Sequence, residues 1–319
     1  MSALISLIRN GHWERREKLF SPGDLPWRSS FGMLPTPYPL DSERIRVLFG
    51  STDNQLFGKT GALDLTWNDK LEIERLHPCP LLDLGMKGSF DDSGSVPSAV
   101  ILVNGERRLL YSGFQRRDDI PYSVFSGLAK ERRDGTWERI SPSPVLGSTT
   151  ESHFFRGGAF VLQDEGVYRM WYLAGQSWIE RPGALPAPSY SMKYFATTHL
   201  DSLPESGVEC LTPNSFVGQI GFCRPWVIKL EQTFFLWTAP RTRLDNGTVT
   251  YHEIAAFESK DGVRWTQLPE SQGLKTSASG WDSEMVCYPS VIYFGGRLLM
   301  LYSGNGNGRE GFGYAELVS

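Results

Sequence analysis

The sequence is poor in cysteine and has no excess of basic residues. Four cysteines occur among 319 residues, without a Cys-x-x-Cys pair, which argues against a disulfide framework or a structural zinc site. The formal net charge is −4, so no basic field attracts nucleic acid or an anionic membrane. We therefore expect reduced thiols, and neither nucleic acid nor membrane as a partner.

Long apolar runs are also missing. No stretch reaches the roughly 20 apolar residues of a membrane span, and the apolar residues 4–8 are fewer than a secretion signal needs. These absences predict a cytoplasmic protein. The chain shows no cofactor pattern, and a single candidate histidine, His153, is weak evidence for metal, so we predict neither a cofactor nor a metal ion.

Glycine and proline are plentiful instead, with 33 and 20 residues, which is too turn-rich for a helical protein. A strand-turn-strand pattern recurs five times at near-constant spacing, and its copies are aligned on Pro37, Pro97, Gly158, Pro225 and Pro289. A long repeat made of strands and turns is typical of propeller blades. The sequence therefore predicts an all-β, five-bladed β-propeller that forms one domain over residues 1–319.

Each copy is expected to continue into two outer strands. In the second copy these lie at residues 123–130 and 134–140, around a tight Asp-Gly turn. Further outer strands are predicted at residues 61–65, 71–76, 190–197, 208–211, 254–259 and 261–268. The fifth copy ends with its third strand, residues 312–317. Residues 11–20 resemble an outer strand, so we predict that this N-terminal strand completes the fifth blade and closes the ring.

The segments that lead into the inner strands ring the mouth of a propeller channel, the default ligand site. Five residues before the aligned positions lie Asp92, His153 and Glu284, which can all move protons. Glycosidic cleavage needs two carboxylates, one to donate a proton and one to attack or to activate water. We predict Glu284 as the acid, because Trp281 and Met285 give it a partly apolar setting, and Asp92 as the ionised partner.

Other residues near the same mouth are candidates for substrate binding: Asp91, Glu151, Arg156, Trp178, Arg224, Trp281 and Asp282. Asp91 and Asp282 fit equally well as turn residues that bond their own backbone. Each arginine is either a strut to a neighbouring carboxylate or a clamp for an anionic substrate group. Trp178 lies in a Pro/Gly-rich insert, residues 176–189, which can form a sugar-stacking wall or a lid.

The blade count and the outer hairpin Ser-x-Asp-Gly-x-x-Trp, residues 259–265, resemble the five-bladed propeller glycoside hydrolases, which include arabinanases, β-xylosidases, invertases and levansucrases. Residues 155–158, Phe-Arg-Gly-Gly, are similar to the invertase Phe-Arg-Asp-Pro element. Cys-Arg-Pro at residues 223–225 stands where that family carries Glu-Cys-Pro or Glu-Gly-Pro. Gly157 thus replaces an acid, no glutamate precedes Pro225, and residues 31–35 lack the usual aspartate, so the family's three acids do not carry over.

Three functional hypotheses follow. The leading one is a carbohydrate-active enzyme, most simply a glycoside hydrolase, acting on a sugar or an anionic sugar conjugate in the central channel. The substrate is then a small molecule or an oligosaccharide. An alternative is a repurposed propeller enzyme, such as a transferase or cyclase, in which Arg156 and Arg224 hold an anionic substrate beside His153. The third is a propeller that binds a glycan or a protein without catalysis.

Overall fold

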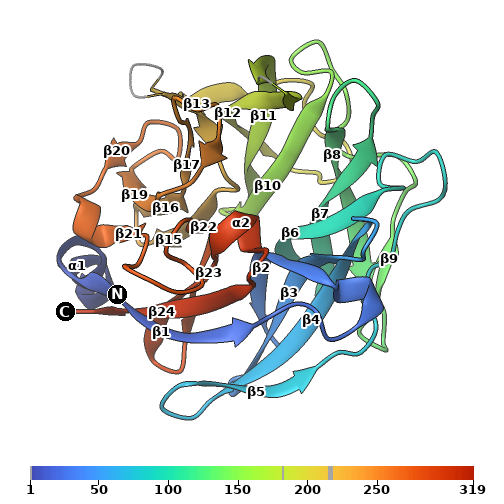
Figure 1. The fold of residues 1–319 in the computed structure, drawn as a ribbon. Coiled ribbons are helices and arrows are strands. Elements are labelled where there is room, and N and C mark those ends of the chain that lie inside the picture. Colours follow the sequence, from blue (N-terminus) through green and yellow to red (C-terminus); the bar gives the residue numbers. More distant parts are fainter. Residues whose placement is uncertain (1, 182, 215–217) are drawn as a thin grey trace.

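The computed structural model describes residues 2–181, 183–214 and 218–319, and nearly all regular structure in it is β-strand (Figure 1). A helix, α1 (Ser2–Asn10), precedes the first strand, and a short helical segment, α2 (Asn305–Gly308), lies before the last. Two 3-10 turns, η1 (Pro26–Arg28) and η3 (Glu270–Gln272), complete the helical elements of the described residues. The structure confirms the all-β prediction.

Consecutive strands pair antiparallel in groups of four. The first group is β2 (Ser30–Pro39), β3 (Arg44–Thr52), β4 (Gly58–Trp67) and β5 (Leu71–Leu76). The second is β6 (Gly94–Val103), β7 (Glu106–Arg116), β8 (Tyr122–Glu131) and β9 (Trp137–Arg139). The third is β10 (Phe155–Asp164), β11 (Val167–Arg181), β12 (Ala184–Thr197) and β13 (Val208–Leu211). Short parallel pairings, β4 with β6 and β8 with β10, join these neighbours.

The next group is split into two sheets. One contains β14 (Gln219–Phe222), β17 (Pro240–Arg243) and β18 (Val249–Thr250). The other contains β15 (Trp226–Leu230), β16 (Thr233–Thr238), β19 (Glu253–Ser259) and β20 (Thr266–Gln267), with β21 (Leu274–Lys275) also on β19. The break between β14 and β15 includes Pro225, which has no N–H to donate to a strand ladder.

The last sheet brings the two ends of the chain together. It has the order β1-β24-β23-β22, with β1 (His12–Phe20), β22 (Cys287–Phe294), β23 (Arg297–Ser303) and β24 (Phe312–Val318). β1 runs antiparallel to β24, from His12 opposite Val318 to Phe20 opposite Phe312, and the chain ends lie near each other in Figure 1. Trp13 and Phe20 are buried by this pairing.

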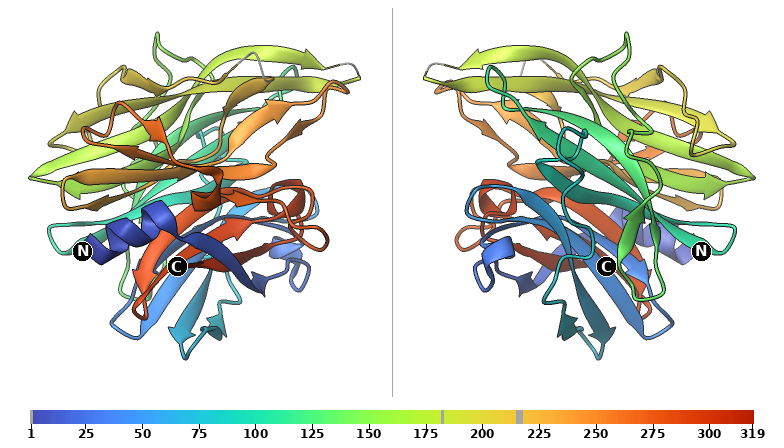
Figure 2. Two further views of the ribbon diagram at one scale, coloured as in Figure 1. Left: turned by 90° about the vertical axis from the view of Figure 1, so that its left-hand side faces the viewer. Right: turned by 90° about the vertical axis from the view of Figure 1, so that its right-hand side faces the viewer.

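The predicted strands of the repeat are confirmed, because residues 71–76 and 208–211 coincide with β5 and β13, and the other predicted strands overlap observed ones. Residues 176–181 and 184–189 of the insert continue β11 and β12, and these two long strands project beyond the other strands in Figure 2. The helix α1 was not predicted; its buried Ile8 packs on the hydrophobic core.

The inner strands share an irregularity that bears on the site. Strand pairing shifts register between Met33 and Thr36 in β2, Pro97 and Ala99 in β6, Gly157 and Phe160 in β10, and Cys287 and Ser290 in β22. In three of these strands the shift includes the aligned position of the sequence repeat, and in β2 it ends next to that position, Pro37. A bulge bends a strand and re-aims its side chains, so each inner strand turns its residues at a corresponding point near the centre of the molecule (Figure 1).

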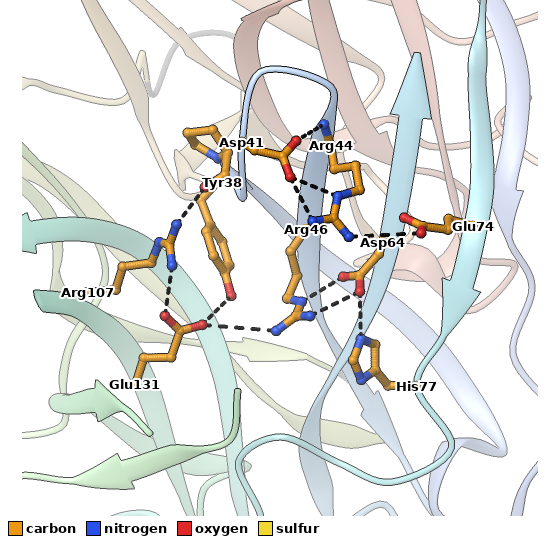
Figure 3. A network of polar contacts seen from close by, with 10 residues as sticks. Tyr38, Asp41, Arg44, Arg46, Asp64, Glu74, His77, Arg107 and Glu131 are labelled. Atoms are coloured by element: carbon orange, nitrogen blue, oxygen red, sulfur yellow. Dashed lines mark hydrogen bonds and ion pairs between the residues drawn. The ribbon is translucent and has the colours of Figure 1, made fainter. Parts of the chain in front are cut away.

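Charged networks connect neighbouring strand groups at the outer strands. Figure 3 shows the one between the first two groups, where Arg46 donates to Asp64 at 2.6 Å and His77 Nε2 lies 3.1 Å from the same carboxylate. Tyr38 donates to Glu131 on the neighbouring group at 3.1 Å. Burial opposes ionisation of Asp64, but hydrogen bonds from His77 and Arg46 hold its pKa well below the ordinary value.

The structure describes all four cysteines as free thiols: Cys79, Cys210, Cys223 and Cys287. Within the described ranges no helix combines the length and the apolar character that crossing a membrane requires. The same part of the chain holds no cluster of His, Cys, Asp and Glu side chains that could ligate a metal ion.

Candidate functional site

A cavity of about 490 Å³ lies between the inner strands. Every strand group contributes to its wall, with Leu34 from β2, Val96 from β6, Phe155 from β10, Phe222 from β14 and Tyr288 from β22. Small-molecule sites in proteins typically have volumes of roughly 300–1,000 Å³. The cavity is therefore the candidate site, and its lining decides what it can bind.

All charged side chains on the described part of the lining are arginines. Arg116 in β7, Arg181 in β11, Arg224 between β14 and β15, and Arg241 in β17 line the cavity, whereas none of the described lining residues is Asp, Glu or His. A guanidinium group stays protonated throughout the physiological pH range. The cavity is thus positively charged in a chain whose net charge is −4.

Arg224 is almost wholly buried, with 1% of its surface exposed. Its terminal nitrogens donate to Thr36 Oγ1 (2.7 Å), the Ser98 carbonyl (2.9 Å), Ser290 Oγ (2.5 Å) and the carbonyls of Pro35 and Pro289 (3.2 Å each). These acceptors belong to three inner strands, but all are neutral, and no carboxylate pairs with Arg224 in the described chain. Burial lowers the pKa of Arg224 to about 9, which leaves the guanidinium charged at neutral pH.

A second arginine is surrounded by tyrosines. We call this group the Arg241 wall; it comprises Arg241, Tyr122, Tyr190, Tyr251 and Tyr288, which all line the cavity. The Arg241 guanidinium lies 5.2 Å from the centre of the Tyr190 ring, and the rings of Tyr251 and Tyr288 are 6.2 Å apart. Burial raises the pKa of Tyr190, Tyr251 and Tyr288, so their hydroxyls stay neutral at pH 7 and do not compensate the arginine.

Backbone strain is concentrated at the cavity. Five non-glycine residues with positive φ line it: Phe31 (69°), Leu34 (51°), Leu56 (62°), Tyr288 (54°) and Asn307 (60°). The remaining described positive-φ residues, Asp69, Asn104, Glu165 and Glu231, do not line it. Bulky residues adopt this conformation at a cost of about 1–3 kcal/mol each, and they persist where the surroundings enforce them, often at ligand sites. The strain supports the cavity as a functional site.

Three of the predicted substrate-binding acids lie outside the cavity lining and form a recurring contact that we call the clasp. In each clasp a lead-in carboxylate accepts a hydrogen bond from a second-strand tyrosine and pairs with a basic residue. The clasps are Asp91 with Tyr111 (3.0 Å) and Arg139 (2.6 Å), Glu151 with Tyr172 (2.7 Å) and Lys193 (2.9 Å), and Asp282 with Tyr302 (2.8 Å) and Arg15 (2.8 Å). Their buried carboxylates hold strands together, which favours the structural interpretation of Asp91 and Asp282.

The clasp environment keeps two of these acids, Glu151 and Asp282, ionised. Burial raises the pKa of Glu151, but hydrogen bonds from Tyr172, Lys193 and the Gly207 amide lower it more strongly. Burial likewise opposes ionisation of Asp282, and bonds from its partners hold its pKa below the usual value. A carboxylate held in this way is a poor proton donor for catalysis.

Arg156, Trp178 and Trp281 also lie outside the lining. Arg156 is buried, pairs with Glu151 at 3.4 Å and donates to the Pro204 carbonyl at 2.9 Å, which makes it a strut. The Trp178 ring packs 4.7 Å from that of Phe154, and Trp281 stacks 5.1 Å from Tyr302. Of the predicted binding residues, Arg224 is the one that the structure places on the cavity.

The three residues predicted to move protons are not gathered at the cavity. Asp92 accepts hydrogen bonds from the Gly88 amide and the Ser93 hydroxyl, both at 2.9 Å, as turn aspartates do. The side chains of His153 and Glu284 are exposed, and none of the three lines the cavity. The setting of Trp281 and Met285 does not enclose Glu284, because the tryptophan stacks on a tyrosine while the methionine is buried.

Sequence reasoning missed Arg116, Arg181 and Arg241, and it named none of the tyrosines of the Arg241 wall as a site residue. Arg241 follows the predicted second strand of the fourth copy, so its position at a strand end was a usable signal. The sequence positions of the tyrosines did not indicate whether they line the cavity. A tyrosine in a strand packs in a core or faces a channel depending on the bulge beside it.

The sequence is similar to that of a known protein along most of its length. No family model matches the sequence. Over 308 residues the chain is 29% identical to uncharacterized protein Rv1502 of Mycobacterium tuberculosis, and the match covers 96% of this chain and 99% of that protein. The similarity thus extends over nearly the whole length of both chains.

Among solved structures, the chain is similar to a glycosyl hydrolase from Bacteroides ovatus, with TM-score 0.67 and 14% identity over 96% of this chain and 93% of that one. It is also similar to a thermostable family-43 glycoside hydrolase, with TM-score 0.58 and 15% identity over 93% and 91% of the two chains. At these identities the likeness concerns the fold. The chain has the propeller fold of glycoside hydrolases, which confirms the resemblance predicted from the sequence at that level.

Proposed function

We propose that this protein binds an anionic sugar or sugar conjugate in its central cavity. The observation that carries the proposal is the lining itself, which among the described residues contains Arg116, Arg181, Arg224 and Arg241 but no Asp, Glu or His. A cavity with one sign of charge and low-dielectric walls concentrates ligands of the opposite sign. An anionic group on the ligand supplies the negative charge that no described residue of the lining provides.

The sugar part of the ligand is supported by two observations. The fold is that of glycoside hydrolases, which act on carbohydrates. The walls also carry aromatic rings, among them Phe31, Phe114 and Phe155, and aromatic faces pack well against the apolar faces of sugar rings. A cavity of about 490 Å³ accommodates a small sugar acid, a sugar ester or the end of an oligosaccharide.

The same lining argues against hydrolysis by a pair of carboxylates. That reaction requires a proton donor and a second carboxylate on either side of the scissile bond. Gly157 stands at the position that resembles the acid of the invertase element, and a Cβ there would lie 2.7 Å from Val124 Cγ1. The lining thus supports the repurposed or non-catalytic hypotheses over hydrolysis. The assignment of Glu284 as acid and Asp92 as base, with His153 nearby, stays a prediction.

The proposal includes the architecture that frames the cavity. The strand groups correspond to the five copies of the sequence repeat, and β1 lies on the edge of the sheet that contains the last copy. We therefore propose one five-bladed domain over residues 1–319, in which residues 11–20 complete the fifth blade. A closed ring gives the cavity a continuous wall and leaves no unpaired strand edge.

Isothermal titration of the wild-type protein with glucose, glucuronate and glucose 6-phosphate tests the proposal. We expect at least one of the two anionic sugars to bind and glucose to bind much more weakly. The variant Val249→Trp places a large side chain in the cavity lining and is expected to abolish binding, whereas Leu102→Trp, on an exposed site, is the matched control. Equal binding of glucose, or binding unaffected by Val249→Trp, would contradict the proposal.

A further inference from the structure

Two tyrosine hydroxyls in the Arg241 wall have no hydrogen-bond partner among the residues that the structure describes. Tyr251 is 5% exposed and lines the cavity, yet its hydroxyl makes no hydrogen bond to any described residue. The Tyr288 hydroxyl is likewise without a partner in the described chain, whereas Tyr122 and Tyr190 lie 3.5 Å apart, oxygen to oxygen, and can bond each other. Neither hydroxyl is among the fully enclosed polar atoms that lack a partner, and both residues line the cavity, so these two groups are open to a ligand.

Arg241 faces the same space with donors to spare. One terminal nitrogen donates to the Pro188 carbonyl, and its Nε and other terminal nitrogen have no acceptor among the described residues. No carboxylate pairs with it in that part of the chain. The side chain is fixed in place by the Pro188 contact and by the Tyr190 ring beneath it. A fixed guanidinium loses little entropy when it binds an oxyanion.

The donors come from separate elements. Arg241 is on β17, Tyr251 lies between β18 and β19, and Tyr288 is on β22. Tyr288 also has a strained backbone, φ 54°, within the bulge of its inner strand. Donors that approach from several directions suit an anion with three or four oxygens better than a planar carboxylate, which has two. The uncompensated charge of Arg224, on the same lining, adds to the attraction.

We infer that the Arg241 wall binds a tetrahedral oxyanion, the phosphate or sulfate group of a sugar ester, through Arg241, Tyr251 and Tyr288. The inference rests on the proposed function and narrows its ligand class. The sugar then extends towards the cavity mouth, where the side chain of Arg116 is exposed. The charged group and the sugar occupy different parts of the cavity, so they can be tested separately.

The first test compares the variants Tyr251→Phe and Tyr288→Phe with the wild type, using inorganic sulfate and inorganic phosphate as probes in calorimetric titrations. Each change removes one hydroxyl, and a hydrogen bond to a charged group contributes enough to expect a loss on the order of 10- to 100-fold in affinity. Tyr293→Phe, on an exposed tyrosine outside the cavity, is the matched control and is expected to change nothing.

Thermal unfolding of the same variants separates ligand binding from a structural role. A hydroxyl that bonds nothing in the protein can be removed without loss, so Tyr251→Phe and Tyr288→Phe are expected to melt at or above the wild-type temperature without ligand. Variants that melt several degrees lower and bind sulfate like the wild type would overturn the inference. Arg241→Gln is expected to lose sulfate binding by more than 100-fold, and Arg116→Gln by only a few-fold.

The probes distinguish the ligand classes. Binding of inorganic phosphate is expected to strengthen as pH rises through its second ionisation, which lies above the pKa of about 6 of a phosphate ester, whereas sulfate binding stays constant. A preference for one of the two anions indicates whether the natural ligand is a phosphate or a sulfate ester. Acetate binding as tightly as either would replace the tetrahedral class by a carboxylate and overturn the inference while leaving the proposed function intact. If neither these anions nor the anionic sugars bind the wild type, the proposed function fails as well.

Discussion

Buried and half-buried arginines occur in two regions of this molecule, and the two sets differ in whether a carboxylate pairs with them. At the clasps and at the boundary shown in Figure 3, each arginine has a carboxylate, as Arg139 has Asp91 and Arg46 has Asp64. In the central cavity, Arg224 and Arg241 have none among the described residues. Removing one partner of a buried pair leaves an uncompensated charge. The paired arginines therefore stabilise the fold, whereas Arg241 keeps donors for an anion from outside and Arg224, whose terminal nitrogens are already bonded, contributes its uncompensated charge.

The largest expected effect is on the paired side, where β1 carries Arg15 to its clasp with Asp282. Deletion of residues 1–20 removes a whole strand, including buried Trp13, Leu19 and Phe20, and exposes the edge of β24. We expect an insoluble or molten protein without a cooperative melting transition. Deletion of residues 1–10 is the control, and this shorter deletion variant should keep a cooperative melting transition. A 1–20 deletion that melts near the full-length midpoint would refute ring closure by β1.

Next in size is a break in the network of Figure 3. Asp64→Asn removes the carboxylate that Arg46 and His77 share and leaves Glu131, 4.0 Å away, as the remaining acid beside the guanidinium. Losing one partner of such a pair costs up to about 3–5 kcal/mol. Chemical denaturation should show this loss, while sulfate affinity at the cavity stays unchanged. A parallel loss of sulfate binding would mean that the two regions are coupled, and the comparison would no longer hold.

Lowering the pH should weaken the paired region while leaving anion binding at the cavity intact. The folded-state pKa values of Asp64, Glu151 and Asp282 lie below their unfolded values near 4. Their contribution to stability is therefore full above that pH and is lost as pH falls through the folded-state values. Melting temperature should fall below about pH 4, and less steeply in Asp64→Asn. Sulfate binding to the protein that remains folded should persist, because the arginines do not titrate there.

The smallest effect is expected from substitutions of Glu284 and Asp92, the two acids predicted from the sequence to be catalytic. Glu284→Gln and Asp92→Asn change residues outside the cavity lining, so binding of anionic sugars should stay within about two-fold and melting behaviour should hold. Titration and turnover assays on the same samples check this. A loss of turnover on the order of 10²–10⁴-fold with binding retained would instead establish Glu284 as a general acid and would contradict our interpretation of the cavity.

The sequence by itself determined the strand repeat, because alternating side chains and Gly or Asp-Gly turns are local signals. Residues 71–76 and 208–211 could be placed without any knowledge of their neighbours. The sequence also placed Arg224 at the channel, since it sits beside Pro225 at the aligned position of the repeat.

Only the tertiary structure decided which charged side chains contact one another. Asp91 and Asp92 are neighbours in one lead-in segment and are the same residue type, yet the first bonds Tyr111 and Arg139 from other strands while the second caps its own turn. Contacts between residues far apart in the chain depend on how each inner strand is bent at its bulge, and a bulge reverses the faces that side chains occupy. For the same reason Arg241 and Tyr288 share one wall only after the strands have assembled.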